Sequence, residues 1–159
     1  KQLSTLKVLG SEPIPTLDKI IAVINGSARL NIELKGKNTA EGVFNIMKKA
    51  IKSGRWKADQ LFVSSFDWDE LRDFKKLTTE FGIAVLTDKN PLDAIPVARE
   101  LNAFAINPKH SHLTQEIVND IHSEGFEIHT WTVNKKKRIE ELISWKVDGI
   151  ITDFPDMVF

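Results

Sequence analysis

Two oppositely charged side chains, Glu33 and Lys35, lie two residues apart in the alternating segment of residues 31–35. In an extended strand, Ile32 and Leu34 take one side, so Glu33 and Lys35 share the other. A carboxylate and an ammonium near the interior of a sheet are costly unless they are paired or used. A hard divalent cation prefers carboxylate oxygens, and a phosphate prefers a cation. The pair therefore indicates either a structural ion pair or a metal and phosphate site.

Two aromatic residues could line the same end of the sheet. Trp131 alternates with Thr130 and Thr132, so its ring lies on the opposite side of a strand from the two hydroxyls. The indole could form an apolar wall for a small ligand while its N–H finds a polar partner. Packing between sheet and helix explains Trp131 equally well. For Phe66, which follows two serines, we favour core packing over a place at this mouth.

The four histidines form no catalytic constellation. His110 and His112 follow a strand, where a barrel carries its catalytic groups, but no other residue supports that role. His122 and His129 are interpreted as surface or structural residues. We therefore predict no catalytic residue within this chain.

The bulk composition excludes several classes of protein. The 159 residues contain 22 basic and 22 acidic side chains, and this balance does not favour a nucleic-acid-binding face. The basic run at residues 135–138 is interpreted as the exposed start of a helix. Cysteine is absent, so disulfides and thiolate metal sites are excluded. No apolar run approaches the roughly 20 residues of a membrane-spanning helix.

Short apolar runs alternate with helical patterns, which predicts a parallel sheet with crossover helices and one domain over residues 1–159. The expected strands are residues 30–34, 61–66, 83–86, 103–106, 127–133 and 149–151. Asp67 and Glu70 have the form of a capping box, Thr39 and Asn134 are predicted helix caps, and Asn25-Gly26 is predicted to stop the first helix. Periodicity alone does not decide between an open sheet and part of a closed barrel.

Several segments occur together in an order that resembles the glycerophosphodiester phosphodiesterase family. They are IPTLDKII (residues 14–21), LNIELKG (30–36), VSSF (63–66), HTWTVN (129–134) and VDGIITDFPD (147–156). The resemblance implies a TIM-type (β/α)8 barrel, here incomplete, with strands three to eight present and two N-terminal units missing. One departure is Lys146, where the family usually has glycine, and this puts a left-handed residue at that helix end in doubt.

The resemblance also implies a chemistry. It makes Glu33 the third carboxylate ligand of a Mg²⁺ or Ca²⁺ ion and Lys35 a phosphate contact. Trp131 could then form an apolar wall for the glycerol backbone, and Phe66 could line the same mouth. The general acid and base histidines and the two other carboxylates are expected before Lys1. The intact protein would release glycerol 3-phosphate and an alcohol from a glycerophosphodiester, and this chain alone would be inactive.

The chain could instead have a non-catalytic function. A six-strand fragment would expose two strand edges, and such edges invite pairing with another chain. The chain could then serve as a binding or assembly module that associates with itself. An unrelated α/β sugar-phosphate enzyme is a third reading, which leaves the order of the family segments unexplained.

Overall fold

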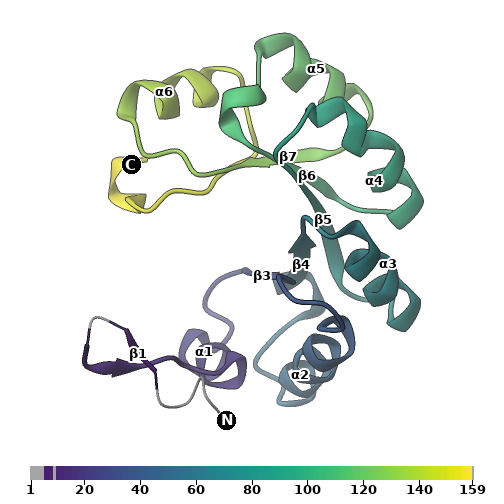
Figure 1. Ribbon diagram of the computed structural model, residues 1–159, viewed down its shortest axis with the longest axis vertical. Coiled ribbons are helices and arrows are strands. Elements are labelled where there is room, and N and C mark those ends of the chain that lie inside the picture. Colours follow the sequence, from purple (N-terminus) through teal and green to yellow (C-terminus); the bar gives the residue numbers. More distant parts are fainter. Residues whose placement is uncertain (1–5, 9, 159) are drawn as a thin grey trace.

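The computed structural model describes residues 6–8 and 10–158, and its centre is a curved parallel sheet (Figure 1). Six strands pair with their neighbours in chain order, so the sheet has the order β3-β4-β5-β6-β7-β8. The strands are β3 (Leu30–Glu33), β4 (Leu61–Ser65), β5 (Gly82–Thr87), β6 (Ala105–Pro108), β7 (Glu127–Thr130) and β8 (Gly149–Ile150). The predicted strand–helix alternation is confirmed.

Helices connect successive strands and cover the convex side of the sheet (Figure 1). They are α1 (Leu17–Ile24), α2 (Ala40–Lys52), α3 (Trp68–Leu77), α4 (Ile95–Leu101), α5 (Gln115–Ser123) and α6 (Lys136–Ser144). Short 3-10 turns are η2 (Ala58–Gln60), η3 (Pro91–Ala94), η4 (His110–His112) and η5 (Pro155–Met157), and β1 (Lys7–Val8) pairs antiparallel with β2 (Glu12–Pro13). Strand β3 does not pair with β8 in the described chain, so the sheet forms a half-barrel.

The two sides of the sheet differ in what they bury. Val63 and Ile32 belong to the main apolar core between the strands and the helices. Phe62 and Ala84 belong to a separate, smaller cluster on the concave side. Because side chains alternate along a strand, Glu33 lies on the concave side, opposite to Ile32. The prediction that Ile32 and Glu33 lie on opposite sides of this strand is confirmed.

The predicted capping box at α3 is wrong in one of its two residues. Asp67 caps the helix as expected, since its carboxylate accepts a hydrogen bond from the Asp69 N–H at 3.1 Å. Glu70 turns away from that helix and accepts from the N–H groups of Asn38, Thr39 (3.0 Å) and Ala40 (3.2 Å) at the start of α2. Thr39 makes no cap bond of its own, so Glu70 supplies the cap that we predicted for Thr39.

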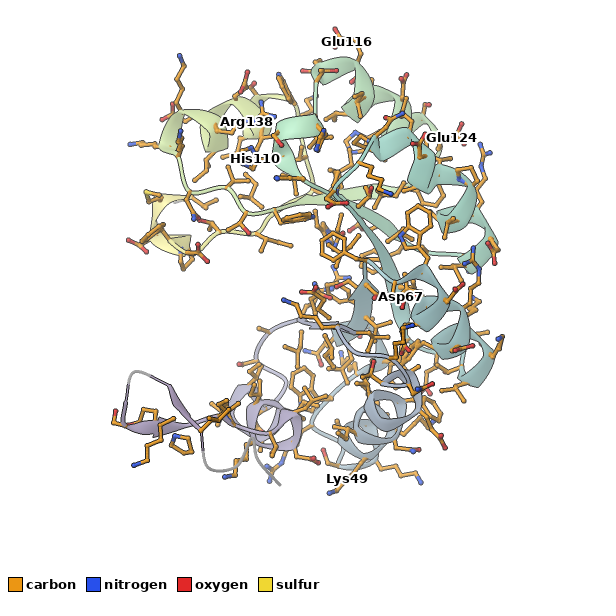
Figure 2. The ribbon with its side chains drawn as sticks, viewed as in Figure 1. Lys49, Asp67, His110, Glu116, Glu124 and Arg138 are labelled. Atoms are coloured by element: carbon orange, nitrogen blue, oxygen red, sulfur yellow. The ribbon has the colours of Figure 1, made fainter. Side chains whose placement is uncertain are left out.

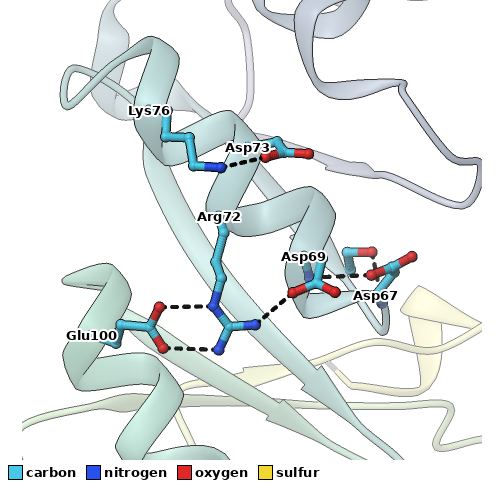
Figure 3. A network of polar contacts seen from close by, with 7 residues as sticks. Asp67, Asp69, Arg72, Asp73, Lys76 and Glu100 are labelled. Carbon is cyan, nitrogen blue, oxygen red and sulfur yellow. Dashed lines mark hydrogen bonds and ion pairs between the residues drawn. The ribbon is translucent and has the colours of Figure 1, made fainter.

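Helices α3 and α4 are joined by a charged contact (Figure 3). The Arg72 guanidinium donates to both oxygens of Glu100, at 2.7 and 2.8 Å, and to Asp69 at 2.8 Å. A two-pronged arginine–carboxylate pair fixes orientation as well as distance. The contact keeps neighbouring helices in register on the convex side.

Asn134 is a second cap that we predicted wrongly. Lys135 occupies the cap position of α6, without a side-chain cap bond. The Asn134 amide instead donates to Asp153 at 2.7 Å and accepts from the Asp153 N–H at 3.0 Å. It therefore ties the loop after β7 to the loop after β8.

Strand ends also differ from the expectation. Trp131 lies beyond β7 and forms only an isolated parallel bridge with Lys109. Strand β6 begins at Ala105 and extends to Pro108, because the Ala103 N–H bonds to Ala98 and so belongs to the end of α4. The first helix ends as predicted, with Asn25 (φ 52°) and Gly26 (φ 75°) in the left-handed region.

Lys146 has a left-handed backbone, with φ 64°, although its side chain makes that conformation unfavourable. We expect Lys146→Gly to stabilise the fold by about 1 kcal/mol, because glycine carries no Cβ strain there. Thermal and denaturant unfolding would measure the change. Glu140→Gly, at an exposed right-handed position within α6, should instead destabilise the fold by about 1 kcal/mol. A loss of stability in Lys146→Gly would contradict this prediction.

Candidate active site

The predicted charged pair lies at the carboxyl end of β3. The Lys35 ammonium is 3.4 Å from a carboxylate oxygen of Glu33, so the structural ion pair that we considered is present. The Lys35 side chain is 78% exposed, whereas that of Glu33 is 30% exposed. An ion pair this open is weak, and both groups remain free to engage an incoming ligand.

The two predicted aromatic residues meet at the same end of the sheet. The Phe66 and Trp131 rings are 5.2 Å apart and nearly perpendicular, at 85°. The Trp131 N–H donates to the Asn107 carbonyl at 2.8 Å, which confirms the expected polar partner. Phe66 is 46% exposed because it lies just beyond β4, so the core role that we favoured for it is wrong. The pair forms a partly exposed aromatic surface.

Glu33 contacts Lys35, and Phe66 contacts Trp131. Among the described residues, no hydrogen bond, ion pair or ring contact joins the charged pair to the aromatic pair. They share the carboxyl ends of parallel strands, which is where α/β barrels place their chemistry.

Two polar side chains on the concave side were missed in the sequence analysis. Ser64 and Asn107 are fully buried, and their side-chain polar atoms have no hydrogen-bond partner in the described structure. Both sit in apolar runs, and their strand position was the only available signal. Buried polar groups without partners are uncommon and mark places where a ligand or another polar group can bind.

The predicted metal ion would need several ligands close together. The described residues contain no group of three or more histidine, aspartate or glutamate side chains that could hold an ion. A hard divalent cation takes six or more oxygen ligands. Glu33 can supply one carboxylate, so the described residues do not fit a complete metal centre by themselves.

The histidines lie away from Glu33. His122 pairs with Asp148 at 2.9 Å and His129 with Glu127 at 3.1 Å, which agrees with the structural roles expected for them. His110 lies beside Arg138, near the start of α6 (Figure 2). No contact links His110 or His112 to the Glu33–Lys35 pair in the described part of the chain.

A separate cavity lies on the concave side of the sheet. It has a volume of about 450 Å³ and lies between the two edge strands. The Arg29 guanidinium lies 5.2 Å from the Phe62 ring centre and 5.1 Å from that of Phe104. Glu33, Phe66 and Trp131 do not line this cavity, so it is separate from the predicted site.

The chain order of the strands and the charged and aromatic groups at their carboxyl ends define a parallel α/β half-barrel of the TIM type. The chain belongs to the glycerophosphoryl diester phosphodiesterase family, whose family model matches residues 1–157. It is 32% identical over 147 residues to a glycerophosphodiester phosphodiesterase of Caldanaerobacter subterraneus, covering 91% of this chain and 60% of the relative. A Bacillus altitudinis glycerophosphodiester phosphodiesterase is also 32% identical, with 92% and 62% covered.

Solved structures share this fold. A Parabacteroides distasonis glycerophosphodiester phosphodiesterase has the same fold with a TM-score of 0.81, at 24% identity, covering 99% of this chain and 67% of that one. An Oleispira antarctica phosphodiesterase, solved with its product sn-glycerol-3-phosphate, has a TM-score of 0.78 at 25% identity, covering 91% and 60%. The chain thus spans about 60% of the length of the curated relatives it matches.

Proposed function

We propose that the intact protein hydrolyses glycerophosphodiesters to glycerol 3-phosphate and an alcohol. The observation that carries this proposal is the family match over residues 1–157, together with Glu33 and Lys35 at the carboxyl end of β3. In this proposal two further βα units complete the barrel of the intact protein. The span of about 60% relative to the curated relatives supports that part.

Glu33 and Lys35 have separate roles in this proposal. Glu33 supplies one carboxylate ligand of a Mg²⁺ or Ca²⁺ ion, and the remaining ligands and the acid and base histidines come from outside these 159 residues. A bound divalent cation stabilises negative charge on phosphate oxygens. Lys35 contacts the phosphate, which its exposed ammonium supports. The Phe66–Trp131 surface contacts the glycerol backbone through its apolar ring faces.

The role of Lys35 can be tested by binding of glycerol 3-phosphate to the intact protein. We expect Lys35→Gln to weaken the affinity about tenfold, because a charge-assisted hydrogen bond to phosphate contributes about 1.5 kcal/mol or more. Isothermal titration calorimetry measures the change. Lys37→Gln removes the same charge from an exposed neighbour and should change affinity less than twofold. Equal losses in both variants would contradict a specific contact.

A second candidate function is a non-catalytic assembly module, favoured by the two sheet edges, β3 and β8, which have no further strand partner among the described residues. Exposed strand edges template pairing with another chain. This alternative predicts association of the intact protein with itself, together with no turnover of glycerophosphodiesters. Light scattering and the hydrolysis assay, applied to the same preparation, separate the two functions.

A further inference from the structure

A second, smaller cavity lies beside the start of α6, between the turn η4 and the loop after β7. Its volume is about 230 Å³, and it is lined by His110, Thr132, Val133, Asn134, Lys135 and Arg138. Figure 2 shows His110 and Arg138 close together at this place. Neither Glu33 nor Lys35 lines it, so it is distinct from the candidate active site. Its elements, β6, β7 and α6, are all present in the described chain.

Two lysines near this cavity have no ion-pair partner in the described part of the chain, whereas Arg138 is paired with Glu141. Lys109 and Lys135 are exposed, and neither takes part in an ion pair among the described residues. Two carboxylates contact residues that line the cavity: Glu141 pairs with Arg138 at 2.5 Å, and Asp153 binds the Asn134 amide.

Arg138 gives the cavity a fixed cationic wall. Its guanidinium donates to the carbonyls of His110 and of Leu113, the latter at 3.1 Å, and lies 4.6 Å from the Trp145 ring centre. A guanidinium held in this way keeps its orientation without a ligand. A bound anion would therefore meet a preorganised positive surface.

Two further features leave hydrogen-bonding capacity open at this place. The Nδ1 atom of His110 is enclosed and has no hydrogen-bond partner in the described structure. Helix α6 begins with no side-chain cap and no acidic residue in its first turn. Lysines at a helix start oppose the helix dipole, and an anion there would be stabilised by both.

His110 itself responds to these charges. Burial lowers the pKa of His110, and the charges of Arg138, Lys109 and Lys135 lower it further. The lowered pKa favours the neutral ring, and a neutral imidazole can donate one hydrogen bond. An anion that neutralises the surrounding cations would raise the pKa of His110 again.

We propose that this cavity binds a phosphate group, either inorganic phosphate or a phosphate monoester, as an anion site separate from the candidate active site. Its volume suits a small anion, since sites for larger organic ligands span about 300–1,000 Å³. Cationic side chains line it from the loop before α6 (Lys135) and from α6 itself (Arg138), which suits an oxyanion with several acceptor oxygens.

The test follows the His110 ring by NMR while the intact protein is titrated with sodium phosphate at pH 7. It uses a Lys35→Gln background, so that phosphate binding at the candidate active site is weakened. We expect a saturable shift of the His110 signals, a raised His110 pKa at saturation, and about tenfold weaker binding in Lys135→Gln. Lys137→Gln removes the same charge from the same helix turn, outside the cavity lining, and should change affinity less than twofold.

Three results would overturn the proposal. They are His110 signals that do not saturate, equal weakening in Lys135→Gln and Lys137→Gln, and equal shifts with chloride at matched ionic strength. A parallel titration with glycerol 3-phosphate identifies the source of the phosphate group. Tighter binding than inorganic phosphate would support an organic monoester, and equal binding would support recognition of the phosphate group alone.

Discussion

Glu33→Gln is expected to lower the rate of glycerophosphodiester hydrolysis by the intact protein at least about 100-fold, as for the loss of one electrostatic group from an active site. The substitution keeps the shape of the side chain and removes the negative charge that a divalent cation prefers. The affinity for Mg²⁺ or Ca²⁺ should fall in parallel. Hydrolysis rates across a cation titration measure both effects.

Folding should not change in this variant, because the ion pair with Lys35 is open to solvent and contributes little. Glu41→Gln removes an exposed carboxylate from the first turn of α2 and serves as the matched control. If Glu33→Gln kept the wild-type rate and cation dependence, Glu33 would be only a structural partner of Lys35.

Glu70→Ala is expected to destabilise the fold by about 3 kcal/mol. The Glu70 carboxylate is only 5% exposed and caps α2 through three backbone N–H groups and the Thr39 hydroxyl. Removing it leaves these donors without their charged acceptor, and hydrogen bonds to charged groups contribute about 1.5–3 kcal/mol. Denaturant unfolding at neutral pH measures the difference, with exposed Glu140→Ala as the control.

The same contact predicts how the stability difference between wild type and Glu70→Ala depends on pH. Burial alone would raise the pKa of Glu70, but the hydrogen bonds from Asn38, Thr39 and Ala40 together hold it below its ordinary value of 4.5. Since the folded-state pKa is lowered, the stabilisation is complete above pH 4.5 and is lost as the pH falls through the folded value. The gap between wild type and Glu70→Ala should therefore stay constant from pH 7 to about 5 and narrow below 4.5. A gap that widened in acid would contradict this cap.

Local patterns in the sequence were sufficient to predict the sheet and one charged pair. Alternation of Ile32, Glu33 and Leu34 depends only on the strand period, so the side taken by each residue followed directly. The end of α1 at Asn25-Gly26 followed from the left-handed conformations that these residues tolerate. Such features are decided within a few residues, and the structure confirms them.

Long-range contacts could not be predicted in the same way. Glu70 has the spacing of a cap for its own helix, yet its carboxylate lies at the start of a helix 30 residues earlier. Asn134 likewise binds Asp153, 19 residues away. The folded arrangement of neighbouring βα units decides these partners. The sequence shows that each of these side chains can form hydrogen bonds, but it does not show which group is the partner.

The candidate active site likewise combines features that the local sequence predicts with features that depend on the fold. The residue types at Glu33, Lys35 and Trp131 indicated a rim site, but the exposure of Phe66 depends on where β4 stops. Asn107 gave no signal beyond its strand position, because it lies in an apolar run, and the lack of a partner for its buried amide among the described residues is evident only in the folded sheet. The exposure of Phe66 and the burial of Asn107 are both decided by the three-dimensional fold.

The most direct test of the proposed function is release of glycerol 3-phosphate from glycerophosphocholine by the purified intact protein. Phosphorus NMR would follow the reaction with Mg²⁺ or Ca²⁺ and with a chelator. We expect the diester signal to convert to a monoester signal only when the cation is present. A folded protein that leaves the diester unchanged with either cation would contradict the proposed hydrolysis and favour the assembly module.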